Sequence, residues 1–157
     1  YDETFVKFLS LKSNVLLRTD HLNESLALHY DLLRMAEAVK DTFGMLKAKV
    51  GIGNTHLKLR KYERSLEIYH DALGMMQKRE YRQKFSFLYN NMAVTFFHLN
   101  NEDSFVYYVK QGIHYSMEGE NLTNHANALF IEISFTDFLC PWYVRRGVSD
   151  PGSAAAG

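Results

Sequence analysis

The sequence predicts an all-α protein in which antiparallel helix pairs stack as a right-handed superhelix, an α-solenoid of about three and a half repeats. Three observations predict this fold class. Both prolines, Pro141 and Pro151, lie near the C-terminus, so nothing in the chain before them forbids helix. Apolar residues recur at steps of three and four, as on a helix with one buried face. The same pattern also returns with a period of about 40 residues, as in a repeat protein.

The pattern is clearest in the middle of the chain. Leu46, Val50 and Leu57 form one apolar stripe before Arg60, and Tyr62 and Tyr69 belong to a second stripe after it. Gly53 lies within the first stripe, where a glycine costs up to about 1 kcal/mol relative to alanine. We therefore expect a neighbouring helix to approach Gly53 closely, and we expect Gly53→Leu to unfold the array.

Shifting the sequence by one repeat period aligns the flanking segments with this central pair. Small residues recur at Ser13, Gly53 and Ala93, and the connections between paired helices fall at Asp20, Arg60 and Asn100. Asp and Asn suit such a connection because they tolerate left-handed backbone, whereas Arg60 suits it less well. The alignment predicts seven helices, near residues 3–18, 21–39, 41–59, 61–78, 80–99, 101–117 and 121–139.

The composition limits which domain organisation and which kinds of partner are possible. We expect a single repeat domain over residues 1–140, followed at 141–157 by a poorly ordered tail or a truncation scar. Lys plus Arg and Asp plus Glu each number 18, so we expect no direct nucleic-acid binding by this segment and no membrane association. The chain begins with Tyr rather than Met, and we expect it to be a fragment of a larger protein.

No pattern in the sequence indicates catalysis, and the protein is expected not to be an enzyme. The seven histidines include no pair three or four residues apart, so no helix presents two imidazoles to a metal. We predict no metal, no cofactor and no catalytic residues, and we interpret His29 and His56 as core residues. Cys140 is the only cysteine, which fits a reducing cytoplasm. A bacterial periplasm is also compatible with it.

The central repeat resembles a known family, the tetratricopeptide repeat (TPR). The residues that carry the resemblance are Gly53, His56, Arg60, Tyr62, Ser65, Tyr69 and Ala72. The family's usual period is about 34 residues and its repeats close with proline, whereas this chain has the longer period and no proline in any repeat. In these respects it resembles the TPR arrays of bacterial signalling proteins. The resemblance implies a protein-binding or peptide-binding module, the sensory or docking part of a larger regulator.

In this family the first helix of each pair lines a concave groove. The register places these residues in the groove: Lys7, Asn14, Arg18, Lys47, Asn54, Lys58, Asn90, Asn91, Phe97, His98 and Asn127. We expect a peptide with its acidic end over the first two repeats and an apolar residue near Phe97. The alternative for the lysines and arginine is an ordinary solvated face. The alternative function is a scaffold that forms homo-oligomers through the aromatic edge at Phe85, Phe87, Tyr89, Phe96 and Phe97.

Overall fold

The computed structural model describes residues 3–76, 79–119 and 122–131, and these residues are helical apart from short connections. The helices are α1 (Glu3–Arg18), α2 (Leu22–Ala38), α3 (Thr42–Lys58), α4 (Tyr62–Met75), α5 (Arg79–Lys84), α6 (Ser86–His98) and α7 (Glu102–Glu118). Residues 122–131 are also helical. The expected tail at 141–157, the last part of the helix predicted at 121–139, and Cys140 lie outside the described residues.

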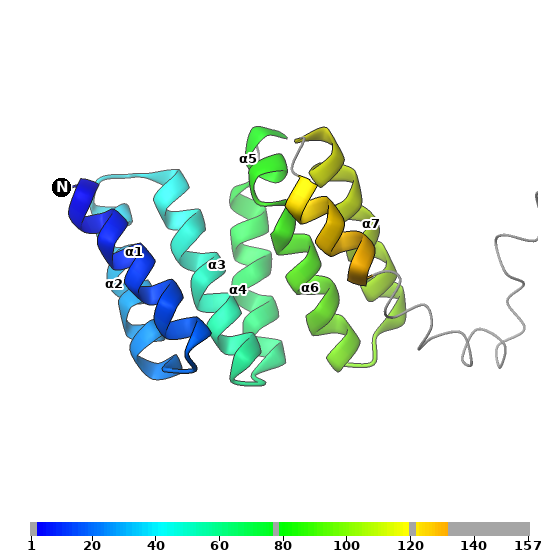
Figure 1. The fold of residues 1–157 in the computed structure, drawn as a ribbon, viewed down its shortest axis with the longest axis horizontal. Coiled ribbons are helices and arrows are strands. Elements are labelled where there is room, and N and C mark those ends of the chain that lie inside the picture. Colours follow the sequence, from blue (N-terminus) through cyan, green and yellow to red (C-terminus); the bar gives the residue numbers. More distant parts are fainter. Residues whose placement is uncertain (1–2, 77–78, 120–121, 132–157) are drawn as a thin grey trace, which may run out of the picture.

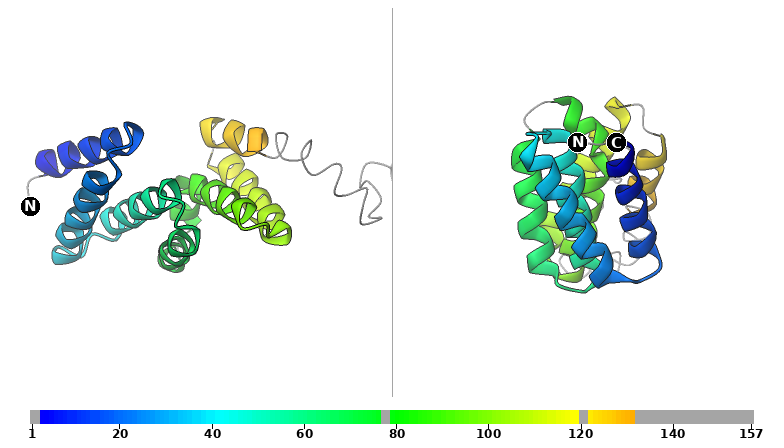
Figure 2. Two further views of the ribbon diagram at one scale, coloured as in Figure 1. Left: turned by 90° about the horizontal axis from the view of Figure 1, so that it is seen from below. Right: turned by 90° about the vertical axis from the view of Figure 1, so that its left-hand side faces the viewer.

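The helices form an arc of antiparallel pairs, as the sequence predicts (Figure 1). Seen from below, α1, α3, α6 and the helix at 122–131 lie along the concave side of the arc, and α2, α4 and α7 lie along the convex side (Figure 2). The main core, which includes Leu46, Tyr69, Met76, Leu88 and Met92, joins α3 and α4 to α6 and α7. None of the helices in the described ranges has both the length and the apolar character needed to cross a membrane.

The predicted connections within the pairs share one backbone conformation, which Lys40 between α2 and α3 also adopts. Asp20, Arg60 and Asn100 have φ angles of 61°, 57° and 55°. The amide of the next residue donates back into the preceding helix each time; for example, the Lys61 N–H lies 2.9 Å from the His56 oxygen. This pattern is a Schellman cap, which satisfies the last carbonyls of a helix. Arg60 therefore adopts the left-handed conformation despite its side chain.

The predicted close approach at Gly53 is also present. A Cβ atom on Gly53 would lie 2.3 Å from the Tyr69 ring, so α4 packs directly on the α3 backbone. The hydroxyl of Ser65 donates to the Gly53 oxygen at 2.9 Å, and in the preceding repeat Ser25 donates to the Ser13 oxygen at the same distance. In these two pairs the small residues thus allow the second helix to bond the backbone of the first.

The predicted helix at 80–99 is wrong in one respect, because it is interrupted at Phe85. The short α5 turns away from the axis of α6, and Arg82 fixes its direction. The Arg82 Nε atom donates to the Met76 oxygen and its Nη1 donates to the Tyr115 hydroxyl, each at 3.0 Å. Phe85 itself is buried in the core. The helix before it ends at Met75 rather than near residue 78, since the buried Met76 turns into the core.

Candidate binding cavity on the concave face

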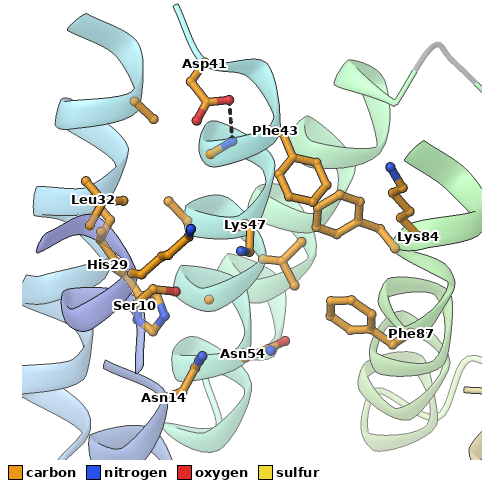
Figure 3. A pocket seen from close by; sticks show the side chains of 18 residues that line it. Ser10, Asn14, His29, Leu32, Asp41, Phe43, Lys47, Asn54, Lys84 and Phe87 are labelled. Atoms are coloured by element: carbon orange, nitrogen blue, oxygen red, sulfur yellow. Dashed lines mark hydrogen bonds between the residues drawn. The ribbon is translucent and has the colours of Figure 1, made fainter. Parts of the chain in front are cut away.

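The concave side holds a cavity of about 530 Å³ between α1, α3 and the start of α6 (Figure 3). Four of the predicted groove residues line it, namely Lys7 and Asn14 from α1 and Lys47 and Asn54 from α3. The register therefore brings together side chains that are one repeat period apart in the sequence. The apolar part of the lining comes from Val6, Leu32, Ala36, Phe43, Ala48, Val50, Phe85 and Phe87.

The charges around the cavity are mainly positive. Lys7, Lys47 and Lys84 contribute ammonium groups, and Asp41 is the only carboxylate among the described residues that line it. That carboxylate caps α3, because its Oδ1 atom accepts from the Gly44 N–H at 3.0 Å. A cap of this kind stabilises the start of a helix. The lysines outnumber the acids in this lining by three to one. Glu80, which lies outside the lining, forms an ion pair with Lys84, so Lys47 is the lysine beside Phe43 that can attract an anionic group.

Two of these lysines meet at one aromatic ring. The Nζ atoms of Lys47 and Lys84 lie 5.3 and 5.7 Å from the centre of the Phe43 ring. Phe43 also packs against Phe85, with their ring centres 5.3 Å apart. Cation–π contacts of this kind hold ammonium groups beside an apolar surface. The rim of the cavity can thus contact a negative group and an apolar group at the same place.

The floor of the cavity is fixed by a hydrogen-bonded junction of three helices. The Asn54 Oδ1 atom on α3 accepts from the Tyr69 hydroxyl of α4 at 2.6 Å and from the Asn91 Nδ2 atom of α6 at 2.8 Å. Because its oxygen is occupied twice, the Asn54 side chain has its amide N–H groups left to offer a ligand. Asn91 itself acts as a support for Asn54 and is not part of the lining.

His29 lines the cavity and is a core residue, as predicted. Its Nδ1 atom lies 2.9 Å from the Ser25 oxygen, and its ring lies against Gly51. Burial lowers the His29 pKa, while the bond to Ser25 acts in the opposite direction. A neutral imidazole at this position adds no charge to the lysines around it.

The other predicted groove residues do not line this cavity. Lys58 holds the end of α1, since its Nζ atom donates to the Leu17 oxygen at 2.9 Å and to Asp20 at 2.8 Å. His98 stacks on Tyr62 and Phe97 packs near Phe105, with ring centres 4.9 and 6.0 Å apart. Arg18 and Asn127 are exposed outside the cavity lining.

Asn90 is buried between α6 and α7. A Cβ atom on Gly112 would lie 2.1 Å from its Oδ1 atom, and its Nδ2 atom donates to the Asn124 oxygen at 3.3 Å. Asn90 therefore packs α6 against the end of the array rather than facing the cavity. The aromatic edge is likewise part of the core at Phe85 and Tyr89, each of which is only 3% exposed.

The sequence prediction missed Phe43 and Lys84. Phe43 stands one helical turn before Lys47, a spacing that places two side chains on one face, and this signal was available. Lys84 had no comparable signal, because its position depends on the break at Phe85. Across residues 3–76, 79–119 and 122–131, no group of three His, Cys, Asp or Glu side chains is arranged to hold a metal ion.

No model of a known protein family matches the chain, and a search of curated proteins gives no match. A solved structure does match: the crystal structure of the TPR domain of Arabidopsis FLU, with a TM-score of 0.65 and 15% sequence identity. The match covers 73% of this chain and 96% of that one. The chain has a TPR-like fold. At this identity the likeness establishes the TPR-like architecture alone, so the chemistry of the cavity must come from its own residues.

Proposed function

We propose that this TPR-like domain is a non-catalytic binding module whose concave cavity holds a peptide segment of a protein partner, within a larger regulatory protein. The observation that carries the proposal is the cavity itself, which combines three lysines, two asparagines and a cluster of phenylalanines. Ammonium groups bind carboxylates, asparagine amides bind peptide backbone, and phenylalanines contact apolar side chains. The three kinds of group together match a peptide better than a small apolar ligand.

We assign the ligand an acidic residue near Lys47 and an adjacent apolar residue on Phe43 and Phe87. Phe97 packs beside Phe105, so the apolar contact is placed on Phe43 instead of Phe97. The peptide backbone crosses between Asn14 and Asn54, which stand on facing helices (Figure 3). An acidic residue next to an apolar residue is therefore the motif that fits the rim.

A peptide array on the purified domain tests this proposal. Fluorescence anisotropy then measures the affinity of the wild type and of Lys47→Glu for the best-binding peptide that carries an acidic residue next to an apolar one. We expect the reversed charge to weaken binding about tenfold or more, and we expect higher salt to weaken binding to the wild type. Lys110→Glu is the matched control, because Lys110 is exposed on the convex helix α7. If neither Lys47→Glu nor Asn14→Ala changes the affinity, the peptide binds outside this cavity.

A further inference from the structure

The space between successive first helices is filled differently from repeat to repeat. In the second repeat, Asn54 of α3, Tyr69 of α4 and Asn91 of α6 are joined there, because the Asn54 oxygen accepts hydrogen bonds from the other two side chains. In the third repeat the register places apolar residues at these positions, and Val109 and Ile131 among them pack in the core or against it. Both of these repeats therefore fill the space with their own side chains.

The first repeat has Asn14, His29 and Gly51 at the same positions, and all three line the cavity. Histidine lacks the phenol hydroxyl and glycine lacks the carboxamide, so the two donors of the second repeat have no counterpart beside Asn14. The contacts have changed as well. The Tyr69 ring lies on Gly53, where an added Cβ would come within 2.3 Å of it, whereas the His29 ring lies on Gly51, where that distance would be 2.1 Å. This part of the cavity is open because of these residue differences.

His29 offers a hydrogen-bond acceptor to this space. Its Nδ1 atom lies 2.9 Å from the Ser25 carbonyl oxygen, and a carbonyl can only accept, so Nδ1 carries the hydrogen. Burial lowers the His29 pKa, so the ring is neutral and its Nε2 atom keeps a lone pair. The side chain is only 3% exposed, and no residue that the structure describes donates to Nε2. Figure 3 shows His29 and Asn14 toward the end of the cavity opposite Asp41.

The chemistry of this space favours a primary carboxamide. Two acceptors are available, the His29 Nε2 atom and the oxygen of Asn14, whose side chain makes no hydrogen bond within the described part of the chain. A carboxylate has no hydrogen to donate to them, and a hydroxyl has one. An ammonium or guanidinium group is opposed by Lys7 and Lys47 in the same lining. A primary carboxamide is uncharged and donates twice from one nitrogen.

We infer that this end of the cavity, which we call the His29 subsite and define by Asn14, His29 and Gly51, binds the side-chain carboxamide of a glutamine or asparagine in the peptide ligand. The carboxamide nitrogen donates to the His29 Nε2 atom and to the Asn14 oxygen. The inference rests on the proposed function, since the side chain belongs to the peptide assigned to this cavity. Gly51 follows Lys47 by four residues, about 6 Å along α3. Two residues of extended peptide span about 6.6 Å, so the carboxamide residue stands two positions from the acidic one.

Propanamide, which reproduces the end of a glutamine side chain, tests the subsite without a peptide. Nuclear magnetic resonance of the whole chain with isotope-labelled histidine reports the His29 Nε2 resonance directly. We expect propanamide to shift this resonance with saturation near about 100 mM, because so small a ligand binds weakly. Methyl propanoate is similar in size and has no N–H group, so it should cause no shift. Equal shifts with the two compounds, or no shift with propanamide, would overturn the inference.

Two octapeptides extend the test to the peptide ligand. Each is an alanine peptide with a central block, Leu-Asp-Ala-Gln in one and Leu-Asp-Ala-Leu in the other, and each block is also made in reverse order. We expect the glutamine peptide of one chain direction to bind about tenfold more tightly than its leucine partner, as measured by fluorescence anisotropy. Lys47→Glu should weaken both peptides by the same factor and leave this preference unchanged.

Two variants remove the subsite in different ways. The triple variant Ser13→Gly, His29→Tyr, Gly51→Asn gives the first repeat the residues of the second, and it should abolish the preference for glutamine while circular dichroism shows a folded chain. Asn14→Leu changes an exposed side chain and should reduce the same preference, so the test does not depend on the folding of the triple variant. A preference that survives Asn14→Leu and the folded triple variant would overturn the inference.

The two tests also separate this inference from the proposed function. If propanamide alone shifts the His29 resonance and no octapeptide binds, the subsite is supported and the proposed peptide ligand is wrong. If both octapeptides bind with equal affinity and Lys47→Glu weakens both, the proposed function is supported and the carboxamide subsite is overturned.

Discussion

His56 is buried in α3 with neither ring nitrogen hydrogen-bonded to any residue that the structure describes. Burial lowers its pKa, and the nearby charges of Arg64 and Lys61 lower it further. The ring is therefore neutral in the folded protein at neutral pH. A buried polar group without a partner lowers stability by about 1 to 3 kcal/mol relative to a satisfied one. The buried imidazole of His56 therefore destabilises the folded state.

Replacement of His56 by leucine, the residue at the same repeat position in α1 (Leu16), should increase stability. We expect the free energy of unfolding at pH 7.5 to rise by about 1 kcal/mol, as measured by urea denaturation. The pH dependence has a definite sign. The folded-state pKa is lowered, so the unfolded chain binds the proton more readily and stability falls as the pH drops below about 6.5.

The difference between the wild type and His56→Leu should therefore widen from pH 7.5 to pH 5.5. Because the other histidines are common to both proteins, subtracting the two stability curves isolates the contribution of His56. If the difference in unfolding free energy between the two proteins is constant from pH 7.5 to pH 5.5, the lowered pKa of His56 is contradicted. A variant that is less stable at both values would show that the leucine side chain does not fit the space of the imidazole.

At the scale of single elements, glycines in the helices have opposite roles. Gly53 lies on α3 under the Tyr69 ring, where an added Cβ would come within 2.3 Å of a ring carbon. Gly74 lies on α4, and an added Cβ there would meet nothing within 4 Å. The two positions share the low helix propensity of glycine and differ in packing and in place, since Gly74 is the next-to-last residue of α4.

Alanine at the two positions should shift stability in opposite directions. We expect Gly53→Ala to lower the melting temperature, since the buried Tyr69 ring must move, at a cost of about 1 to 3 kcal/mol. Gly74→Ala should raise it, because alanine favours helix by up to about 1 kcal/mol. Thermal denaturation followed by circular dichroism measures both. If both variants shift the melting temperature in the same direction and by the same amount, helix propensity alone determines stability at these two positions.

Local patterns predicted most elements, and long-range contacts explain the exceptions. The register identified the caps at Asp20, Arg60 and Asn100 because a cap depends on residues close in sequence. The interruption at Phe85 depends on Arg82, which bonds Tyr115 on a helix far along the chain, and no local pattern encodes that bond. The residues of the cavity also divide into those that a local pattern predicts and those that depend on long-range contacts. Lys47 and Asn54 follow from the register, whereas Lys84 lies beside Phe43 only because α5 turns.

At the scale of the whole molecule, the array depends on contacts between neighbouring pairs. In repeat proteins the stability is approximately a sum over repeats and their interfaces. The bonds of Asn54 to Tyr69 and Asn91 join α3, α4 and α6 at the middle of the arc. This junction also forms the floor of the cavity, so the same side chains that join the repeats position a groove residue.

Asn91→Ala should weaken the joint between the two halves of the array. Its amide contributes one bond to Asn54, and the loss of that bond should lower the free energy of unfolding by about 1 kcal/mol. Because α6 and α7 lie on the far side of the junction, we expect their amide hydrogens to exchange faster while those of α1 and α2 change little. Hydrogen-exchange mass spectrometry resolves the two halves. Asn14→Ala is the control, since Asn14 is exposed on α1 and takes no part in the hydrogen bonds of the junction. Uniformly faster exchange along the whole chain would instead show that the array unfolds as a single cooperative unit.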